Sequence, residues 1–193
     1  LVNKNLVARL QANGVNAMGL TGADMNVLLS DRRPPKKMLI KGENGQPDEE
    51  QTVDFGFVGD VKKADGRALS ALISQGITPV MAPLTHDGKG NMLNTNADTM
   101  AGECAKGLSA LFDVHLVFCF EKAGVLRDEN DDDSVVPQIN RATYAELLEQ
   151  GIVNGGMIPK LDNAFAAIDA GVSEVIITKA SALNDLTKGS HLI

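Results

Sequence analysis

Apolar residues recur along the chain with two spacings, one typical of helices and one of strands. Helical spacing marks residues 2–13, 64–75, 97–112, 143–150 and 158–170. A glycine suited to the left-handed position follows four of these helices, at Gly14, Gly76, Gly151 and Gly171. Extended or continuously apolar runs mark residues 15–20, 27–29, 53–58, 77–82, 114–120 and 175–178. This alternation predicts an α/β fold with a mainly parallel sheet, helices on both faces, and ligands at the carboxyl ends of the strands.

Residues 32–51 interrupt the alternation with prolines, lysines and few apolar positions. They predict a solvated excursion, in which residues 38–40 form a short edge strand. A change in composition near Phe112 predicts two lobes, residues 1–112 and 113–193. The chain opens with Leu1 inside a helical pattern, without Met, a capping residue or a signal-peptide pattern. We therefore expect the chain to be a fragment.

Composition narrows the classes of partner. The 193 residues carry a net charge of −7, with one Tyr and no Trp to stack on bases, so we expect a small-molecule ligand and no nucleic acid. The longest apolar stretches, such as residues 116–120, have the length of a strand, so no membrane association is expected. Cys104 and Cys119, within a helical and a strand pattern, suggest buried free thiols in a reducing compartment, the cytoplasm.

Polar residues gather before the helix expected from residue 97. Asn94, Asn96 and Asp98 are more side chains than one helix cap requires. The surplus could face a ligand at the positive end of the helix. Simple capping is the alternative interpretation.

A second candidate is the stretch from Gly155 to Lys160. Gly155 and Gly156 allow a close approach of backbone to ligand, and Pro159 suits a helix start. A lysine in the first helical turn is unfavourable by about 0.3–1 kcal/mol, which a bound phosphate would reverse. A lysine that simply faces solvent is the alternative.

A third candidate is the loop of residues 121–126, which directly follows a buried strand. A nucleotide would lie at such a loop in this architecture, although a plain connecting turn has the same sequence character. The acidic run 128–133 is interpreted as a solvated loop, since it lacks the spacing of a calcium loop. His86, His115 and His191 stand apart, so no metal site is expected.

The ordered motifs at 53–61, 77–80, 94–99 and 155–160 (VDFGFVGDV, ITPV, NTNADT and GGMIPK) closely resemble the N-acetylglutamate kinase family, which belongs to the amino-acid kinases. The resemblance runs in register from about Asn3 to Thr178. It implies phosphorylation of the side-chain carboxylate of N-acetyl-L-glutamate by ATP with magnesium, the second step of arginine biosynthesis. It also implies the amino-acid kinase fold, a three-layer α/β/α sandwich with a mainly parallel central sheet, in a homodimer or homohexamer.

The resemblance also implies roles for particular residues. Asn94 matches the substrate-binding asparagine, Asp98 the organising aspartate and Lys160 the second lysine that stabilises the transition state. Residues 1–112 would hold the acylglutamate and 113–193 the nucleotide, with magnesium held mainly through the phosphates. The nucleotide loops would be formed by Glu121, Lys122, Ala123, Gly124, Val125 and Leu126, and by Ile152, Val153 and Asn154.

The chain departs from the family pattern in three places. Glu121 and Lys122 replace an aspartate and an apolar residue, and the sequence after Thr178 differs from the usual ending. The segment that carries the first lysine, the glycine loop and the substrate-binding arginine is not seen. We therefore expect an N-terminally truncated kinase, with no measurable activity in these 193 residues alone.

Two alternatives remain open. One is a kinase for another N-acylglutamate, such as N-succinylglutamate. The other is a non-catalytic module that binds arginine, although such a module would need neither Lys160 nor Asp98. The absence of a nucleophilic triad fits a kinase, because a carboxylate with a pKa of about 4.3 is already ionised at neutral pH and needs no base.

Overall fold

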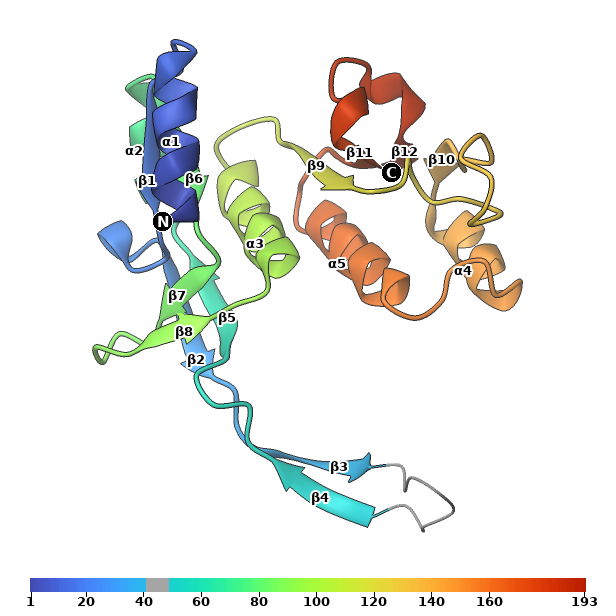
Figure 1. Ribbon diagram of the computed structural model, residues 1–193, viewed down its shortest axis with the longest axis horizontal. Helices are drawn as coiled ribbons and strands as arrows, with labels where there is room; N and C mark the ends of the chain where they lie inside the picture. The colour runs from blue at the N-terminus through green and yellow to red at the C-terminus, as the bar shows by residue number, and fades with distance from the viewer. Residues whose placement is uncertain (41–48) are drawn as a thin grey trace. The chain divides into compact units, whose positions relative to one another are not determined.

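The computed structural model describes residues 1–40 and 49–193 and divides them into two compact units (Figure 1). The first comprises Leu1–Lys63 and Thr78–Asn96, and the second comprises Ala64–Ile77 and Ala97–Ile193. These bounds differ from lobes 1–112 and 113–193, because residues 64–77 and 97–112 pack with the C-terminal unit. The binding roles expected for the two lobes stay predictions. Residues 41–48 of the expected excursion lie outside the described residues.

The first unit contains helix α1, the 3₁₀ turn η1 and small sheets. Strands β1 and β6 pair in parallel, β3 and β4 form an antiparallel hairpin, and the order β5-β2-β7-β8 makes a four-stranded sheet. The expected edge strand 38–40 is confirmed as part of β3. The elements are α1 (Val2–Ala12), β1 (Ala17–Leu20), η1 (Asp24–Asn26), β2 (Leu28–Arg32), β3 (Lys36–Ile40), β4 (Glu49–Val53), β5 (Gly59–Ala64), β6 (Thr78–Met81), β7 (Leu84–His86) and β8 (Met92–Asn94).

Helix α1 is joined to the β1–β6 pair through polar contacts. Asn3 Nδ2 donates to the carbonyl of Val80 at 2.8 Å and Lys4 Nζ to that of Gly19 at 2.7 Å. A Cβ at Gly19 would lie 2.0 Å from Asn3 Oδ1, so a larger residue there would displace the Asn3 side chain from its contact. The apolar stripe expected on this helix is not buried, since α1 has no buried residue.

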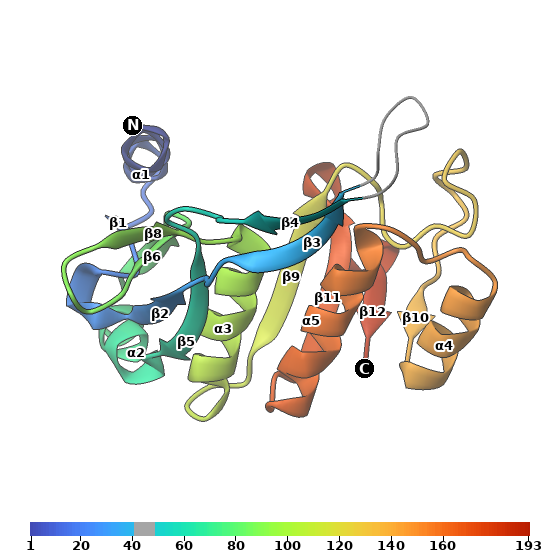
Figure 2. The ribbon, with the colours of Figure 1, turned by 90° about the horizontal axis from the view of Figure 1, so that it is seen from below.

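The second unit is built on a mixed sheet of order β10-β12-β11-β9. β9 and β11 pair in parallel over six residues, from Glu174 opposite His115 to Lys179 opposite Phe120. Helices α3 and α5 lie side by side against this sheet (Figure 2). The elements are α2 (Gly66–Ser74), α3 (Ala97–Ser109), β9 (His115–Phe120), β10 (Gln138–Ile139), α4 (Arg141–Glu149), α5 (Met157–Asp169), β11 (Glu174–Lys179), η2 (Ala180–Ala182), η3 (Leu186–Lys188) and β12 (Ser190–Leu192).

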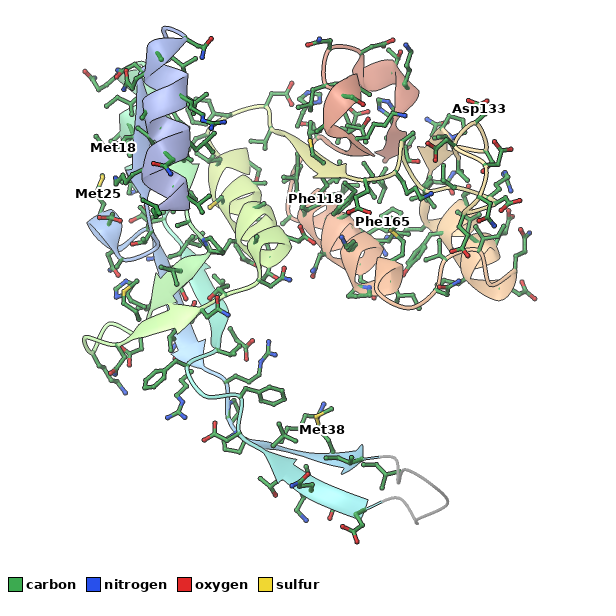
Figure 3. The ribbon with its side chains drawn as sticks, in the orientation of Figure 1. Met18, Met25, Met38, Phe118, Asp133 and Phe165 are labelled. Atoms are coloured by element: carbon green, nitrogen blue, oxygen red, sulfur yellow. The ribbon has the colours of Figure 1, made fainter. Side chains whose placement is uncertain are left out.

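The core of this unit is formed between the helices and the sheet. Leu161 and Ala164 of α5 and Val175 of β11 are fully buried. Phe118 of β9 and Phe165 of α5 belong to the same core (Figure 3), together with Tyr144 of α4. The predicted α/β class with mainly parallel pairing is confirmed, with β7–β8, β3–β4 and β11–β12 as antiparallel exceptions.

The strand predicted over 53–58 is wrong. Gly56 has φ +66°, and its N–H bonds to Asp54 Oδ1 at 2.9 Å, so the chain turns there. Strand β5 begins at Gly59, the residue at which the predicted strand was expected to end. A Cβ at Gly59 would lie 2.8 Å from Thr85 Oγ1 and 2.9 Å from Thr95 Oγ1, so glycine is needed there for packing inside a strand.

Candidate active site

Helices α3 and α5 run in the same direction and begin close together. Near their starts Lys160 Nζ lies 3.5 Å from Asp98 Oδ2, and at their ends Ser109 Oγ donates to the carbonyl of Ala170 at 3.1 Å. The positive ends of two helix dipoles are therefore adjacent. The start of a helix suits an anion such as a phosphate.

Lys160 and Asp98 form a partly shielded ion pair. Their side chains are 31% and 30% exposed. Lys160 is the fourth residue of α5 and Asp98 the second of α3, so each is held by the first turn of a helix that buries one face. Asp98 offsets the unfavourable placement of a cation at a helix start, while Lys160 stays accessible to an incoming anion.

The second contact of Lys160 is aromatic and was missed from the sequence. Its Nζ lies 3.4 Å from the centroid of the Phe120 ring, a cation–π geometry. Phe120 ends strand β9 and stacks on Phe118, with centroids 6.1 Å apart and planes at 18°. Its position at the carboxyl end of an apolar strand could have suggested a place near the site, but no local pattern links it to Lys160.

The two predicted nucleotide loops meet at one pocket within the second unit. The pocket has a volume of about 200 Å³. It is lined by Lys122, Gly124, Val125 and Leu126 of the first loop, Ile152 and Asn154 of the second segment, and Glu129 and Met157. Three of the predicted residues do not line the pocket: Glu121, which is exposed, Ala123, which is half-buried, and Val153, which belongs to the core.

Lys122 connects this pocket to the acidic loop. Its Nζ donates to the carbonyl of Glu129 at 2.9 Å and lies 3.7 Å from Asp132 Oδ1. Glu129 also lines an adjoining pocket of about 510 Å³. The interpretation of 128–133 as merely solvated is therefore incomplete, although Asp133 points outward (Figure 3).

The C-terminal segment anchors the first loop. Ser190 Oγ on β12 accepts a hydrogen bond of 2.9 Å from the buried N–H of Val125. A Cβ at Gly124 would lie 2.6 Å from the same oxygen, so the loop can approach β12 only through glycine. The ending that departs from the family pattern thus supports the pocket.

Asn94, the remaining predicted residue, belongs to the first unit. It ends β8, where its N–H donates to the carbonyl of Phe57 at 2.7 Å and its side chain is exposed. The adjacent Thr95 is buried, and its hydroxyl shares a 2.8 Å hydrogen bond with Thr85. The strand end is therefore fixed while the Asn94 amide is accessible to a ligand, and its role stays a prediction.

Other chemistries have little support among the described residues. No group of three or more His, Cys, Asp or Glu side chains in residues 1–40 and 49–193 could hold a metal ion. Burial raises the pKa of Cys104 to about 11, helped by Glu103, so this thiol is not an ionised nucleophile at neutral pH. The expectation that Cys119 is buried is wrong, because this residue lies on the exposed face of β9. Within the same ranges no helix is long and apolar enough to cross a membrane.

Comparisons with known proteins agree with this geometry. The profile of the amino acid kinase family matches residues 1–179. Acetylglutamate kinase of Bacteroides thetaiotaomicron is 64% identical over 185 residues, which cover 96% of this chain and 66% of that protein. Acetylglutamate kinase of Cytophaga hutchinsonii is 58% identical, over 100% of this chain and 70% of that protein. The chain thus spans about two thirds of the length of these relatives.

Solved structures show the same fold. The crystal structure of smu.665 from Streptococcus mutans superposes with a TM-score of 0.71 at 26% identity, covering 99% of this chain and 66% of that one. N-acetylglutamate synthase of Neisseria gonorrhoeae, complexed with coenzyme A and N-acetyl-glutamate, gives a TM-score of 0.72 at 20% identity. The superposition covers 99% of this chain and 41% of that one. Together with the paired helix starts and the loop pocket, these matches show that the chain belongs to the amino acid kinase family.

Proposed function

We propose that this chain carries the nucleotide site and part of the acceptor site of a kinase that phosphorylates the side-chain carboxylate of N-acetyl-L-glutamate with ATP. The observation that carries the proposal is the Lys160–Asp98 pair at two adjacent helix starts. Met157, one helical turn before Lys160, lines the loop pocket, so the cation and the pocket share one face of α5. The names of the relatives supply the acceptor.

The lining of the pocket suits the base of a nucleoside triphosphate. Val125, Leu126 and Ile152 offer apolar contact for a base, while Asn154 and Lys122 add polar groups. The triphosphate would extend toward the helix starts, where Lys160 binds the transferring group. Magnesium, held mainly through the phosphates, would neutralise their charge, and residues of this chain orient the groups around it.

The roles proposed for the individual residues follow from the chemistry of phosphoryl transfer. The acceptor carboxylate is ionised at neutral pH, so alignment and charge neutralisation decide the rate. In this proposal Lys160 stabilises the charge that develops on the transferring group, Asp98 positions that lysine, and Asn94 binds the acylglutamate. A homo-oligomeric state, dimer or hexamer, and a place in the cytoplasm belong to the same proposal and rest on the resemblance.

A kinase for another N-acylglutamate has the same loop pocket and differs only in its acceptor. Rates with N-acetylglutamate and N-succinylglutamate, measured side by side, distinguish the two. A non-catalytic arginine-binding module would bind arginine and release no ADP with any acceptor.

The deciding experiment replaces the cation. In the full-length protein, Lys160→Ala should lower kcat by about 10²–10³-fold, because the contact strengthens as charge moves in the transition state. The dissociation constant for magnesium ATP, measured by calorimetry, should change only a few-fold. Lys188→Ala is the matched control, since Lys188 also forms an ion pair in the second unit, 3.2 Å from Asp185. An unchanged kcat in Lys160→Ala would contradict the proposal.

A further inference from the structure

We infer that Phe120 is a positioning residue, whose ring holds the Lys160 ammonium in the place where the transferring phosphate arrives. The inference rests on the proposed function, which gives Lys160 its role. The ammonium lies 3.4 Å from the centroid of the ring and 3.5 Å from Asp98 Oδ2.

The ring is itself held in place from two sides. Phe120 is the last residue of β9 and lies in register with Lys179 of β11, so the sheet fixes its backbone. Its side chain packs against the buried core and stacks on Phe118, which is 6% exposed. A rigid ring therefore defines one wall of the space in which Lys160 can move.

The chemistry of the contact suits a cation that must be available to a phosphate. An aromatic face attracts an ammonium through its quadrupole but has no lone pair that competes strongly for the ammonium protons. A second carboxylate in place of the ring would neutralise Lys160 before the phosphate arrived. One carboxylate and one ring orient the ammonium while leaving its donors able to bind an anion.

The contact also connects two parts of the proposed nucleotide site. Phe120 directly precedes the 121–126 loop, which lines the pocket with four of its residues. Lys160 belongs to the helix whose Met157 lines the same pocket. The ring thus sets the position of the ammonium relative to the loop that would bind the nucleotide. Apolar packing alone would be supplied equally well by a leucine.

A spectroscopic measurement tests the position without reference to catalysis. In the NMR spectrum of protein that contains ¹³C-labelled lysine, the ε-methylene protons of Lys160 should resonate upfield because they lie over the ring. The Lys160→Arg variant assigns this signal, since the signal disappears from its spectrum. We expect Phe120→Leu to abolish the upfield shift and Phe120→Tyr to retain it. An unchanged Lys160 signal in Phe120→Leu would overturn the inference.

Kinetic measurements then test whether the position of the Lys160 ammonium affects the rate of phosphoryl transfer. In the full-length protein, Phe120→Leu should lower kcat by about 10–100-fold with KM for ATP and for the acceptor within about twofold, since misplacement of about 1 Å can cost 10²-fold. Phe120→Tyr should restore kcat. Phe112→Leu, at a partly exposed phenylalanine of the same unit, is the matched control for loss of a ring. Thermal unfolding checks that each variant is folded.

The outcomes separate this inference from the proposed function. If Lys160→Ala retains kcat, the proposed function fails. If Lys160→Ala loses kcat while Phe120→Leu retains it, only the positioning role fails. If KM rises in Phe120→Leu with kcat unchanged, the ring serves ground-state binding and the inference is likewise overturned.

Discussion

Among single residues, the contrast between Lys160 and Lys122 shows how environment assigns roles to two lysines of one unit. Lys160 sits between one carboxylate and one ring at two helix starts. Lys122 already donates to a backbone carbonyl and lies near Asp132. Lys160 is positioned by groups that leave its N–H donors available to a transferring phosphate, whereas one donor of Lys122 is already used by a backbone carbonyl.

Asp98 and Asn94 should respond differently to substitution. We expect Asp98→Asn to lower kcat by about 10–100-fold with both substrate dissociation constants near normal, because loss of the charge leaves Lys160 less well oriented. Asn94→Ala should mainly raise KM for the acceptor, because it removes a binding group. Initial rates of ADP release over a matrix of ATP and acceptor concentrations measure both. Indistinguishable kinetics in the two variants would refute this division of roles.

Between elements, the contact of α2 with α3 depends on glycine. A Cβ at Gly66 would lie 1.8 Å from the carbonyl oxygen of Gly107, which is backbone and cannot rotate away. We expect Gly66→Ala to lower the free energy of unfolding by about 1–3 kcal/mol or more, measured by urea denaturation.

Gly102 of α3 is the matched control for this substitution. A Cβ there meets nothing within 4 Å. Gly102→Ala should therefore raise the free energy of unfolding by about 0.4–1 kcal/mol through reduced freedom of the unfolded chain. Equal destabilisation by both substitutions would show that close approach is not the reason for Gly66.

Strand β12 and the pocket loop are linked by one buried hydrogen bond. Ser190→Ala removes the acceptor of the Val125 N–H. A buried donor without a partner costs about 1–3 kcal/mol, so we expect that loss of stability together with weaker nucleotide binding. Ser181→Ala, at an exposed serine of the same C-terminal segment, should change neither. Calorimetry with magnesium ATP and urea unfolding provide the two measurements.

Across the whole chain, stability should depend on pH through a carboxylate that joins three strands. Glu174 on β11 bonds to His191 on β12 and, at 3.1 Å, to His115 on β9, which also lies 3.8 Å from Asp113. The hydrogen bond with His191 is the main cause that lowers the pKa of Glu174, and the bond with His115 contributes.

A lowered carboxyl pKa means that the folded state favours the ionised form. Its contribution is fully present above the unfolded pKa, about 4.3, and is lost as the pH falls through the folded value. We expect Glu174→Gln to lower the free energy of unfolding by about 1–3 kcal/mol at pH 7, with the difference shrinking below pH 4. Glu149→Gln, at an exposed glutamate, is the control. A difference that stays constant from pH 7 to pH 3 would contradict the assignment.

The sequence by itself determined the order and type of most elements. Helical and extended spacing are properties of contiguous residues, so they report local backbone geometry and burial. Helix α5 and strand β9 match their predicted ranges to within one or two residues, and Gly76 and Gly151 have the expected positive φ. The match of 53–58 to a strand pattern failed because a local turn can carry the same alternation.

The chemistry of the candidate site was only partly readable from sequence. Residue types and motif resemblance indicated Asp98 and Lys160, since a charged side chain at a helix start has a local electrostatic signature. Local patterns did not show that the two side chains form a pair. That contact depends on how α3 and α5 pack.

Only the tertiary structure decided that Phe120 faces Lys160, that Lys122 binds the acidic loop, and that β12 anchors Val125. These contacts join residues separated by between 7 and 65 positions. Their formation depends on strand register and helix packing, which are set by the whole core. The physical reason is that periodicity specifies which face of an element is buried, whereas the partner buried against it is chosen by the fold as a whole.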